Sequence, residues 1–188
     1  MSRSHVSVGL WRRWIPVSAL MALLVLGFAG CTRREVTPTG GRVVIGPNQL
    51  SLIPPPAWHV TRLPGMDFRI VSGDAIGMME PNLLVDGVYD HGEVHDIAGM
   101  IVQRYRTRYP DYLHSDMAAS PTAAVTGDAA VRWTASRGLG ESGRIALVHY
   151  LVSMSGSTVV ITGSCDESTQ ARCIPLMDVA VATVRMAH

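Results

Sequence analysis

Lysine is absent from the sequence, and all 16 basic residues are arginine. Against 15 acidic residues the formal net charge is +1, so no basic face of the kind that binds nucleic acid is expected. The three cysteines form no CxxC pair, which argues against a redox motif or a zinc ribbon. A GxSxG elbow is also missing, and no arrangement of Ser, His and Asp indicates nucleophilic catalysis. We therefore expect no catalytic residue, no cofactor and no nucleic-acid partner.

An apolar run near the N-terminus, Ile15–Phe28, has 14 residues. It follows three arginines, and residues 1–30 contain no acidic side chain. A spanning helix needs roughly 20 apolar residues, so the run is too short for one. A positive start and a short apolar middle are typical of an export signal. Residues 1–30 are therefore predicted to be a signal peptide.

The run ends at Phe28, Ala29, Gly30 and Cys31, which resemble the lipobox of bacterial lipoproteins, with Phe28 where Leu is usual. The resemblance implies that the Cys31 thiol carries a lipid, with palmitate among the expected acyl groups. At about 0.8 kcal/mol per buried methylene, two or three acyl chains hold a protein stably on a bilayer. Ordinary secretory cleavage nearby and an uncleaved anchor are the alternatives. We expect the protein on the cell membrane or outer membrane, with its domain outside the cytoplasm.

Removing Cys31 from the count leaves one pair, Cys165 and Cys173. In an oxidising compartment such a pair is expected to form a disulfide. The loop that it closes has about nine residues, which corresponds to about 2 to 3 kcal/mol in the chain-entropy model.

The predicted organisation is a signal peptide (1–30), a lipidated flexible tether (31–47) and one folded domain (48–188). The tether is rich in Thr, Pro and Gly and has no apolar period to bury. Short apolar runs broken by Gly, Pro, Asn and Asp then indicate strands and turns. Strands are predicted near Gln49–Ile53, Trp58–Leu63, Asp67–Val71, Leu83–Tyr89, Tyr112–Ala118, Ala129–Ser136, Arg144–Ser153 and Thr158–Ser164.

Two helices interrupt this pattern. The first has apolar residues at helical spacing from Val94 to Tyr109, and Asp90 with Glu93 is interpreted as its capping box. Three arginines near its end, at positions 104, 106 and 108, permit an anion site. Residues two apart on a helix point to different sides, so a solvated helix end is the favoured interpretation. The second helix follows Cys173, with Pro175 in its first turn and Ile174, Met177, Val181 and Val184 as its buried stripe.

Strands, helix, strands and helix predict an α+β fold, with a single largely antiparallel sheet of six to seven strands covered by helices. Four segments, Pro54–Trp58, Asn82–Val85, Gly92–Val94 and Gly127–Ala130, are similar to motifs of the PsbP-like superfamily, which includes DcrB-type bacterial lipoproteins. Ala57 stands where that family usually has Gly. The resemblance implies this fold, used mainly as a non-enzymatic binding or assembly module. Fold analogy does not name the partner.

Three further patterns have ordinary structural interpretations. Gly138–Gly143 spells GxGxxG, but a predicted strand follows it where a dinucleotide site needs a helix. His91, Glu93 and His95 are weak candidates for metal ligands, because their spacing is not HExxH and a capped helix start explains them equally well. Trp58 is expected in the core, although its position beside three prolines also suits a ligand groove.

Two functional hypotheses follow. The first is a membrane-tethered, non-enzymatic binding or assembly protein of the cell envelope with an envelope protein as its partner. The alternative is an envelope lipoprotein that binds a small ligand or a metal.

Overall fold

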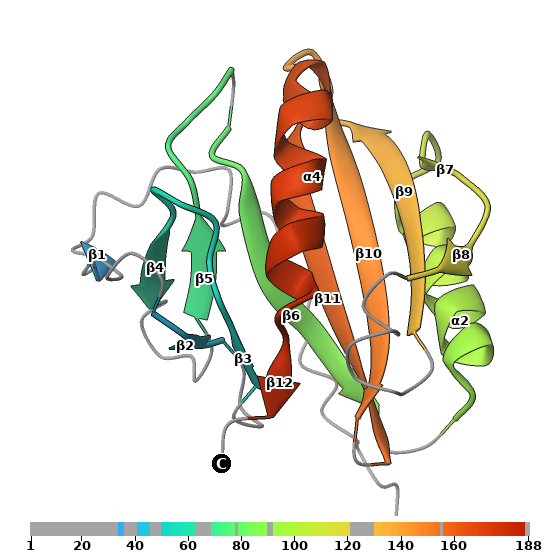
Figure 1. Cartoon of the computed structure of the whole chain (residues 1–188). Coiled ribbons are helices and arrows are strands. Elements are labelled where there is room, and N and C mark those ends of the chain that lie inside the picture. The colour runs from blue at the N-terminus through green and yellow to red at the C-terminus, as the bar shows by residue number, and fades with distance from the viewer. Residues whose placement is uncertain are drawn as a thin grey trace, which may run out of the picture. The chain divides into compact units, whose positions relative to one another are not determined.

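The computed structural model describes residues 34–35, 41–45, 50–62, 69–77, 79–89, 92–120, 130–154 and 156–186. The fold is α+β, with two helices and antiparallel pairing between all neighbouring strands of these segments (Figure 1). The predicted fold class is therefore confirmed. The predicted signal peptide (1–30) and Cys31 lie outside the described residues.

The larger sheet has nine strands, eight of them in the order β1-β4-β5-β6-β11-β10-β9-β7, and β8 also pairs with β9. It contains more strands than predicted because three two-residue strands, β1, β7 and β8, join its edges. The bounds are β1 Arg34–Glu35, β4 His59–Arg62, β5 Arg69–Ser72, β6 Asn82–Tyr89, β7 Leu113–His114, β8 Ala118–Ala119, β9 Ala130–Gly138, β10 Arg144–Met154 and β11 Ser157–Asp166.

A smaller sheet has the order β12-β3-β2, formed by Arg185–Met186, Leu50–Leu52 and Val43–Val44. In this sheet β12, near the C-terminal end of the described chain, pairs with β3, which pairs in turn with β2 near the N-terminal end. Two of its strand segments bury apolar side chains in the same cluster, and the Ile45 N–H donates to the Leu50 carbonyl at 2.8 Å.

The segment expected to be a flexible tether, 31–47, thus supplies β1 and β2 and buries Val43 and Ile45. The packed part of the chain therefore begins before the expected boundary at residue 48. A two-residue strand is too short to show an alternating pattern of apolar residues, and its partner lies elsewhere in the chain, so the local sequence does not reveal it.

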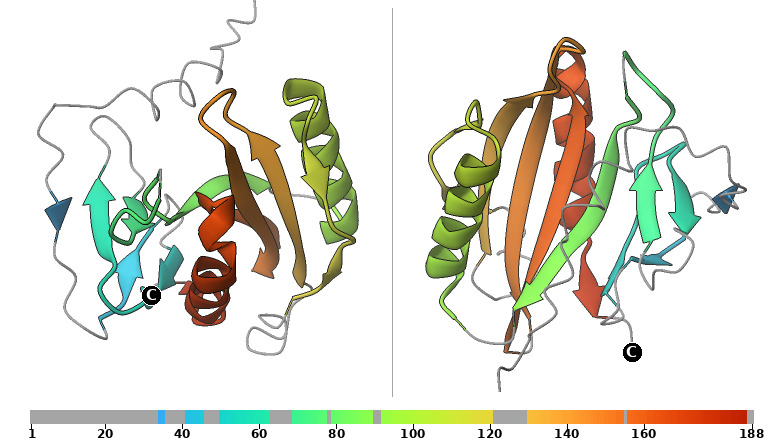
Figure 2. Two further views of the ribbon diagram at one scale, coloured as in Figure 1. Left: turned by 90° about the horizontal axis from the view of Figure 1, so that it is seen from above. Right: turned by 180° about the vertical axis from the view of Figure 1, so that it is seen from behind.

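β10 lies between two layers and is buried on both faces. Ile145, Leu147 and Leu151 belong to the apolar cluster with α2 (Val94–Arg108), whereas Val148 and Val152 belong to the cluster with α4 (Gln170–Val181). Successive side chains of a strand point to opposite faces, so the continuous apolar run serves both layers. The two helices accordingly cover opposite faces of the sheet (Figure 2).

α2 begins at Val94, and Glu93 is its N-cap without a side-chain capping hydrogen bond. The predicted capping box with Glu93 at its third position is therefore wrong, because Glu93 is itself the capping residue. The predicted apolar stripe is confirmed, since Val94, Ile97 and Ile101 are buried against the sheet.

α4 begins five residues before Pro175, so the predicted first-turn position of this proline is wrong. The 3₁₀ turn Glu167–Thr169 directly after β11 starts the helix earlier, where the Asp166 side chain accepts from the Ser168 N–H at 2.9 Å. Met177, Val181 and Val184 are fully buried, as predicted.

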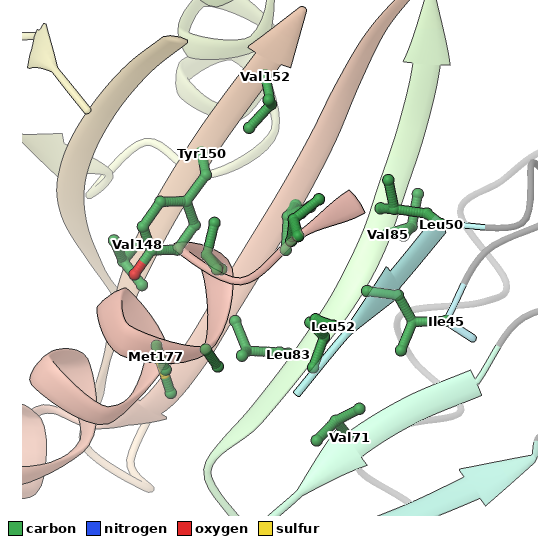
Figure 3. Close-up of a cluster of buried hydrophobic side chains, with 14 of the residues drawn as sticks. Ile45, Leu50, Leu52, Val71, Leu83, Val85, Val148, Tyr150, Val152 and Met177 are labelled. Carbon is green, nitrogen blue, oxygen red and sulfur yellow. The ribbon is translucent and has the colours of Figure 1, made fainter. Parts of the chain in front are cut away.

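Gly163 of β11 allows α4 to approach the sheet. A Cβ at this position would lie 2.6 Å from the Met177 Sδ atom and 2.8 Å from Cγ1 of Val148. The Met177 side chain therefore occupies the space that any larger residue would need, and Figure 3 shows it beside Leu83 in this core. Trp58 and Trp133 are also buried, as expected for core residues.

Candidate functional site

The predicted metal ligands are not brought together by what the structure describes. Glu93 and His95 lie at the start of α2 with exposed side chains, and His91 lies outside the described residues. Within the described segments no group of three His, Cys, Asp or Glu side chains is placed to hold a metal ion. The metal interpretation gains no support from this geometry.

Cys165 and Cys173 meet between the end of β11 and the first turn of α4. Both are buried, with 1% and 2% exposure, and they stand as free thiols. Burial, together with the neighbouring Cys173 thiol and its hydrogen bond, raises the pKa of Cys165 to about 12. The Cys173 thiol also donates to the Thr169 hydroxyl at 3.5 Å. The two residues are thus adjacent, and the disulfide between them stays a prediction.

A polar chain runs through the layer between α2 and the sheet. His149 is fully buried, and its Nδ1 lies 3.0 Å from the Thr162 hydroxyl, which donates to the Asp86 carboxylate at 3.4 Å. Because the hydroxyl proton is used by the carboxylate, Nδ1 is the protonated nitrogen, and Nε2 has no hydrogen-bond partner in the described structure.

Asp86 reaches this chain because of an irregularity in β6. The β6–β11 register shifts where Val160 pairs with Gly87 and Ile161 pairs with Val85, which leaves Asp86 as the extra residue. Such a bulge re-aims a side chain. The Asp86 carboxylate accepts from Arg104 at 3.3 Å and from the Tyr105 hydroxyl at 3.4 Å.

Aromatic rings enclose His149. Its ring stacks on Trp133 at 4.8 Å between centroids and meets Tyr105 edge-on at 5.0 Å. Burial, with smaller effects from Arg104 and His114, lowers the pKa of His149 to about 3. With 0% exposure, His149 is enclosed by the core of the described structure.

On the other face of the sheet, Asp178 of α4 is held by two strands. Arg132 of β9 donates to both of its carboxylate oxygens, at 2.7 and 3.0 Å. Tyr150 of β10 donates its hydroxyl to the same carboxylate at 2.7 Å. The group fixes the helix to the sheet and leaves the Asp178 carboxylate occupied.

A third polar group lies at the C-terminal end of α2, and we call Arg106, Arg108, Tyr109 and Arg137 the arginine–tyrosine cluster. Tyr109 is the C-cap of α2, and its N–H donates to the Tyr105 carbonyl at 2.8 Å. The Arg108 guanidinium lies 5.4 Å from the Tyr109 ring centroid, and the Arg137 guanidinium of β9 lies 4.3 Å from the same centroid.

Arg106 lies in the same last turn of α2, and its charge acts on Tyr112. Burial raises the pKa of the Tyr112 hydroxyl, and its hydrogen bond with Trp133 and the charge of Arg106 oppose that rise. The helix end therefore presents guanidinium groups over a set of packed aromatic rings, in which Tyr105 and Tyr112 lie 5.2 Å apart.

The sequence signalled only part of this cluster. Arg106 and Arg108 were visible as cationic residues at a helix end, but Arg137 joins them through the packing of β9 on α2. The favoured interpretation of a simply solvated end is incomplete, because Arg108 and Arg137 share one ring despite coming from different elements. Asp86 and His149 were missed for the same reason, since a bulge and two neighbouring strands bring them together.

The GxGxxG loop lies next to the cluster and is a hairpin turn, as predicted. Arg144 begins β10 directly after it, so no helix follows the glycines. The Gly138 N–H donates to the Asp111 carboxylate, which also accepts from Arg144 at 3.3 Å.

No family model matches the sequence, and no curated protein sequence matches it. Solved structures share the fold at low identity. LpqN of Mycobacterium tuberculosis, which is involved in cell envelope biogenesis, has a TM-score of 0.56 at 10% identity, over 85% of this chain and 93% of LpqN. Cyanobacterial PsbP (CyanoP) of Synechocystis sp. PCC 6803 has a TM-score of 0.50 at 12% identity, over 86% and 99%. The expected PsbP-like fold is thereby confirmed.

Among the described helices, none has the length and apolar character needed to cross a bilayer.

Proposed function

We propose that this chain is a lipid-anchored protein of the cell envelope whose folded domain is a non-enzymatic binding or assembly module. The observation that carries the proposal is the sequence Phe28–Cys31, which closes a short apolar run ahead of the folded domain. Acylation of Cys31 would hold the domain at a membrane surface outside the cytoplasm. The PsbP-like fold supports the proposal, since LpqN, a protein of cell envelope biogenesis, shares it.

The burial of reactive side chains supports a non-enzymatic role. His149, Cys165 and Cys173 are each no more than 2% exposed, and the His59–Ser72 pair, whose Nε2 and Oγ lie 2.9 Å apart, is also buried, with 9% and 4% exposure. Acid–base and nucleophilic catalysis require the group to come within hydrogen-bond reach of a substrate. The carboxylates of Asp86, Asp111 and Asp178 are each occupied by arginine.

Replacing Cys31 by serine tests the anchor. We expect Cys31→Ser to leave the membrane fraction and to lose incorporation of an alkynyl palmitate analogue, because serine provides no thiol for the lipid. Cys173→Ser is the matched control, and it is expected to keep both the label and the membrane location. Label in the Cys31→Ser protein, or membrane retention without label, would contradict the lipid anchor.

Affinity capture from detergent-solubilised envelope tests the module. The full-length lipidated protein should retain at least one envelope protein reproducibly, and that protein should be absent from captures with an unrelated lipoprotein of similar abundance. Reproducible turnover of a substrate by purified protein, lost in one active-site variant, would contradict the non-enzymatic part.

A further inference from the structure

We propose that the arginine–tyrosine cluster at the end of α2 binds a phosphate-bearing ligand. The site consists of the guanidinium groups of Arg108 and Arg137 at the Tyr109 ring, with Arg106 in the same last turn of α2. This site does not depend on the lipid anchor, and through it the domain would recognise the phosphate group of a ligand.

Uncompensated charge is the first argument. Arg104, Arg132 and Arg144 each face a carboxylate, at 3.3, 2.7 and 3.3 Å. Within the described segments, by contrast, no member of the cluster forms an ion pair. The like charges of Arg108 and Arg137 at one ring repel each other, and an anion bound close to both relieves that repulsion.

Unused hydrogen-bond donors are the second argument. A guanidinium carries five N–H donors. Arg137 gives one of them to the Gly138 carbonyl at 3.4 Å, and its buried Nε finds no acceptor among the residues that the structure describes. Arg106 and Arg108 make no side-chain hydrogen bond within the same segments. The terminal nitrogens of Arg106 and Arg108, and Nη2 of Arg137, therefore remain able to bind an external acceptor.

Orientation is the third argument. Arg108 and Arg137 approach one ring from two different elements, at 5.4 and 4.3 Å from its centroid. Packing against an aromatic face restricts a guanidinium before any ligand arrives, so less conformational entropy is lost on binding. Planar guanidinium forks match the oxygen spacing of phosphate in a bidentate manner.

Asp111, which contacts the residue next to Arg137, does not neutralise the cluster. The Asp111 carboxylate is already bound by the Gly138 N–H and by Arg144, which also faces Glu167 at 3.5 Å. The Arg108 and Arg137 guanidiniums both lie near one ring, at 5.4 and 4.3 Å from its centroid. A phosphate carries several acceptor oxygens on one phosphorus atom, which suits the planar forks of arginine side chains.

The test is calorimetric titration of the full-length protein in non-ionic detergent with inorganic phosphate and, separately, with glycerophosphoglycerol, the soluble headgroup of an anionic phospholipid. We expect at least one probe to bind, and binding to weaken about tenfold in Arg108→Gln and in Arg137→Gln, because each variant loses charge-assisted hydrogen bonds. A preference for glycerophosphoglycerol indicates a lipid headgroup, and a preference for inorganic phosphate indicates a soluble ligand.

Arg172→Gln is the matched control. Arg172 is an exposed arginine of α4, so the variant changes net charge equally without touching the cluster. We expect its affinity to equal that of the unaltered protein, and thermal unfolding should show that all three variants are folded. The proposal is overturned if neither probe binds, if Arg172→Gln weakens binding as much as the cluster variants do, or if the protein binds only an acidic peptide.

Discussion

Acidification should destabilise the fold through His149. Its imidazole is neutral in the folded protein because burial lowers its pKa to about 3, whereas an unfolded histidine has a pKa of about 6.5. Between these values the unfolded chain binds a proton that the folded chain excludes, so the free energy of unfolding falls as the pH falls. The stability that His149 contributes by staying neutral is fully present above about pH 7. Between pH 8 and pH 5 the free energy of unfolding falls by about 2 kcal/mol for this reason.

The surroundings of His149 explain why protonating it in the folded protein is unfavourable. Arg104 on α2 and His114 on β7 disfavour a second positive charge, and the Asp86 carboxylate reaches the imidazole only through the Thr162 hydroxyl. Nε2, where the additional proton would bind, has no partner in the described structure. A protonated His149 would therefore be a buried charge without a direct counterion, which is strongly unfavourable.

Urea denaturation followed by circular dichroism at pH 5, 6, 7 and 8 measures the effect. His149→Phe removes the titrating group, so its stability should change about 2 kcal/mol less between pH 8 and pH 5 than that of the unaltered protein. His95→Gln changes an exposed histidine of α2 and should leave the pH dependence unaltered. Equal pH dependence in the unaltered protein and His149→Phe, or an NMR titration of His149 with a pKa near 6.5, would refute the reasoning.

Two further predictions concern packing and the cysteines. Gly163→Ala should lower the free energy of unfolding by about 1 to 3 kcal/mol, because the added methyl group overpacks the core. Gly99→Ala, which adds a methyl group in open space on α2, should raise it by about 0.5 to 1 kcal/mol. Chemical denaturation measures both changes, and an unchanged free energy of unfolding in Gly163→Ala would contradict the packing at this position. Non-reducing peptide mapping of envelope-purified protein should recover Cys165 joined to Cys173, and its reduction should cost about 2 to 3 kcal/mol. Free thiols at both positions would exclude the bridge.

Much of the fold could be predicted from local patterns. The apolar stripe of α2 and the glycine-rich turn before β10 are local signals, and both are confirmed. The resemblance at Pro54–Trp58 also has a structural counterpart. Ala57 has a φ of +66°, a conformation that glycine adopts at little cost, and it stands where the PsbP-like motif usually has glycine.

The features that the sequence did not predict correctly share a different cause. β2 lies in a segment rich in Thr, Pro and Gly, and only its pairing with β3 makes it a strand. The start of α4 is set by the Asp166 side chain rather than by the first-turn preference of Pro175. At the candidate site, Arg137 reaches Tyr109 across two elements. Contacts between distant segments decide each case, and no window of local sequence contains them.

The order of strands has a consequence for a chain that is synthesised from its N-terminus. β6 cannot gain its partner on the inner side of the sheet until β11 has emerged, and β3 pairs with β12, the last strand described. Pairings between distant segments form slowly because loop-closure entropy opposes them. The β9–β11 meander, whose strands are neighbours in sequence, can form without waiting. The N-terminal half therefore emerges first but completes its folding last, and losing the final residues would leave it open.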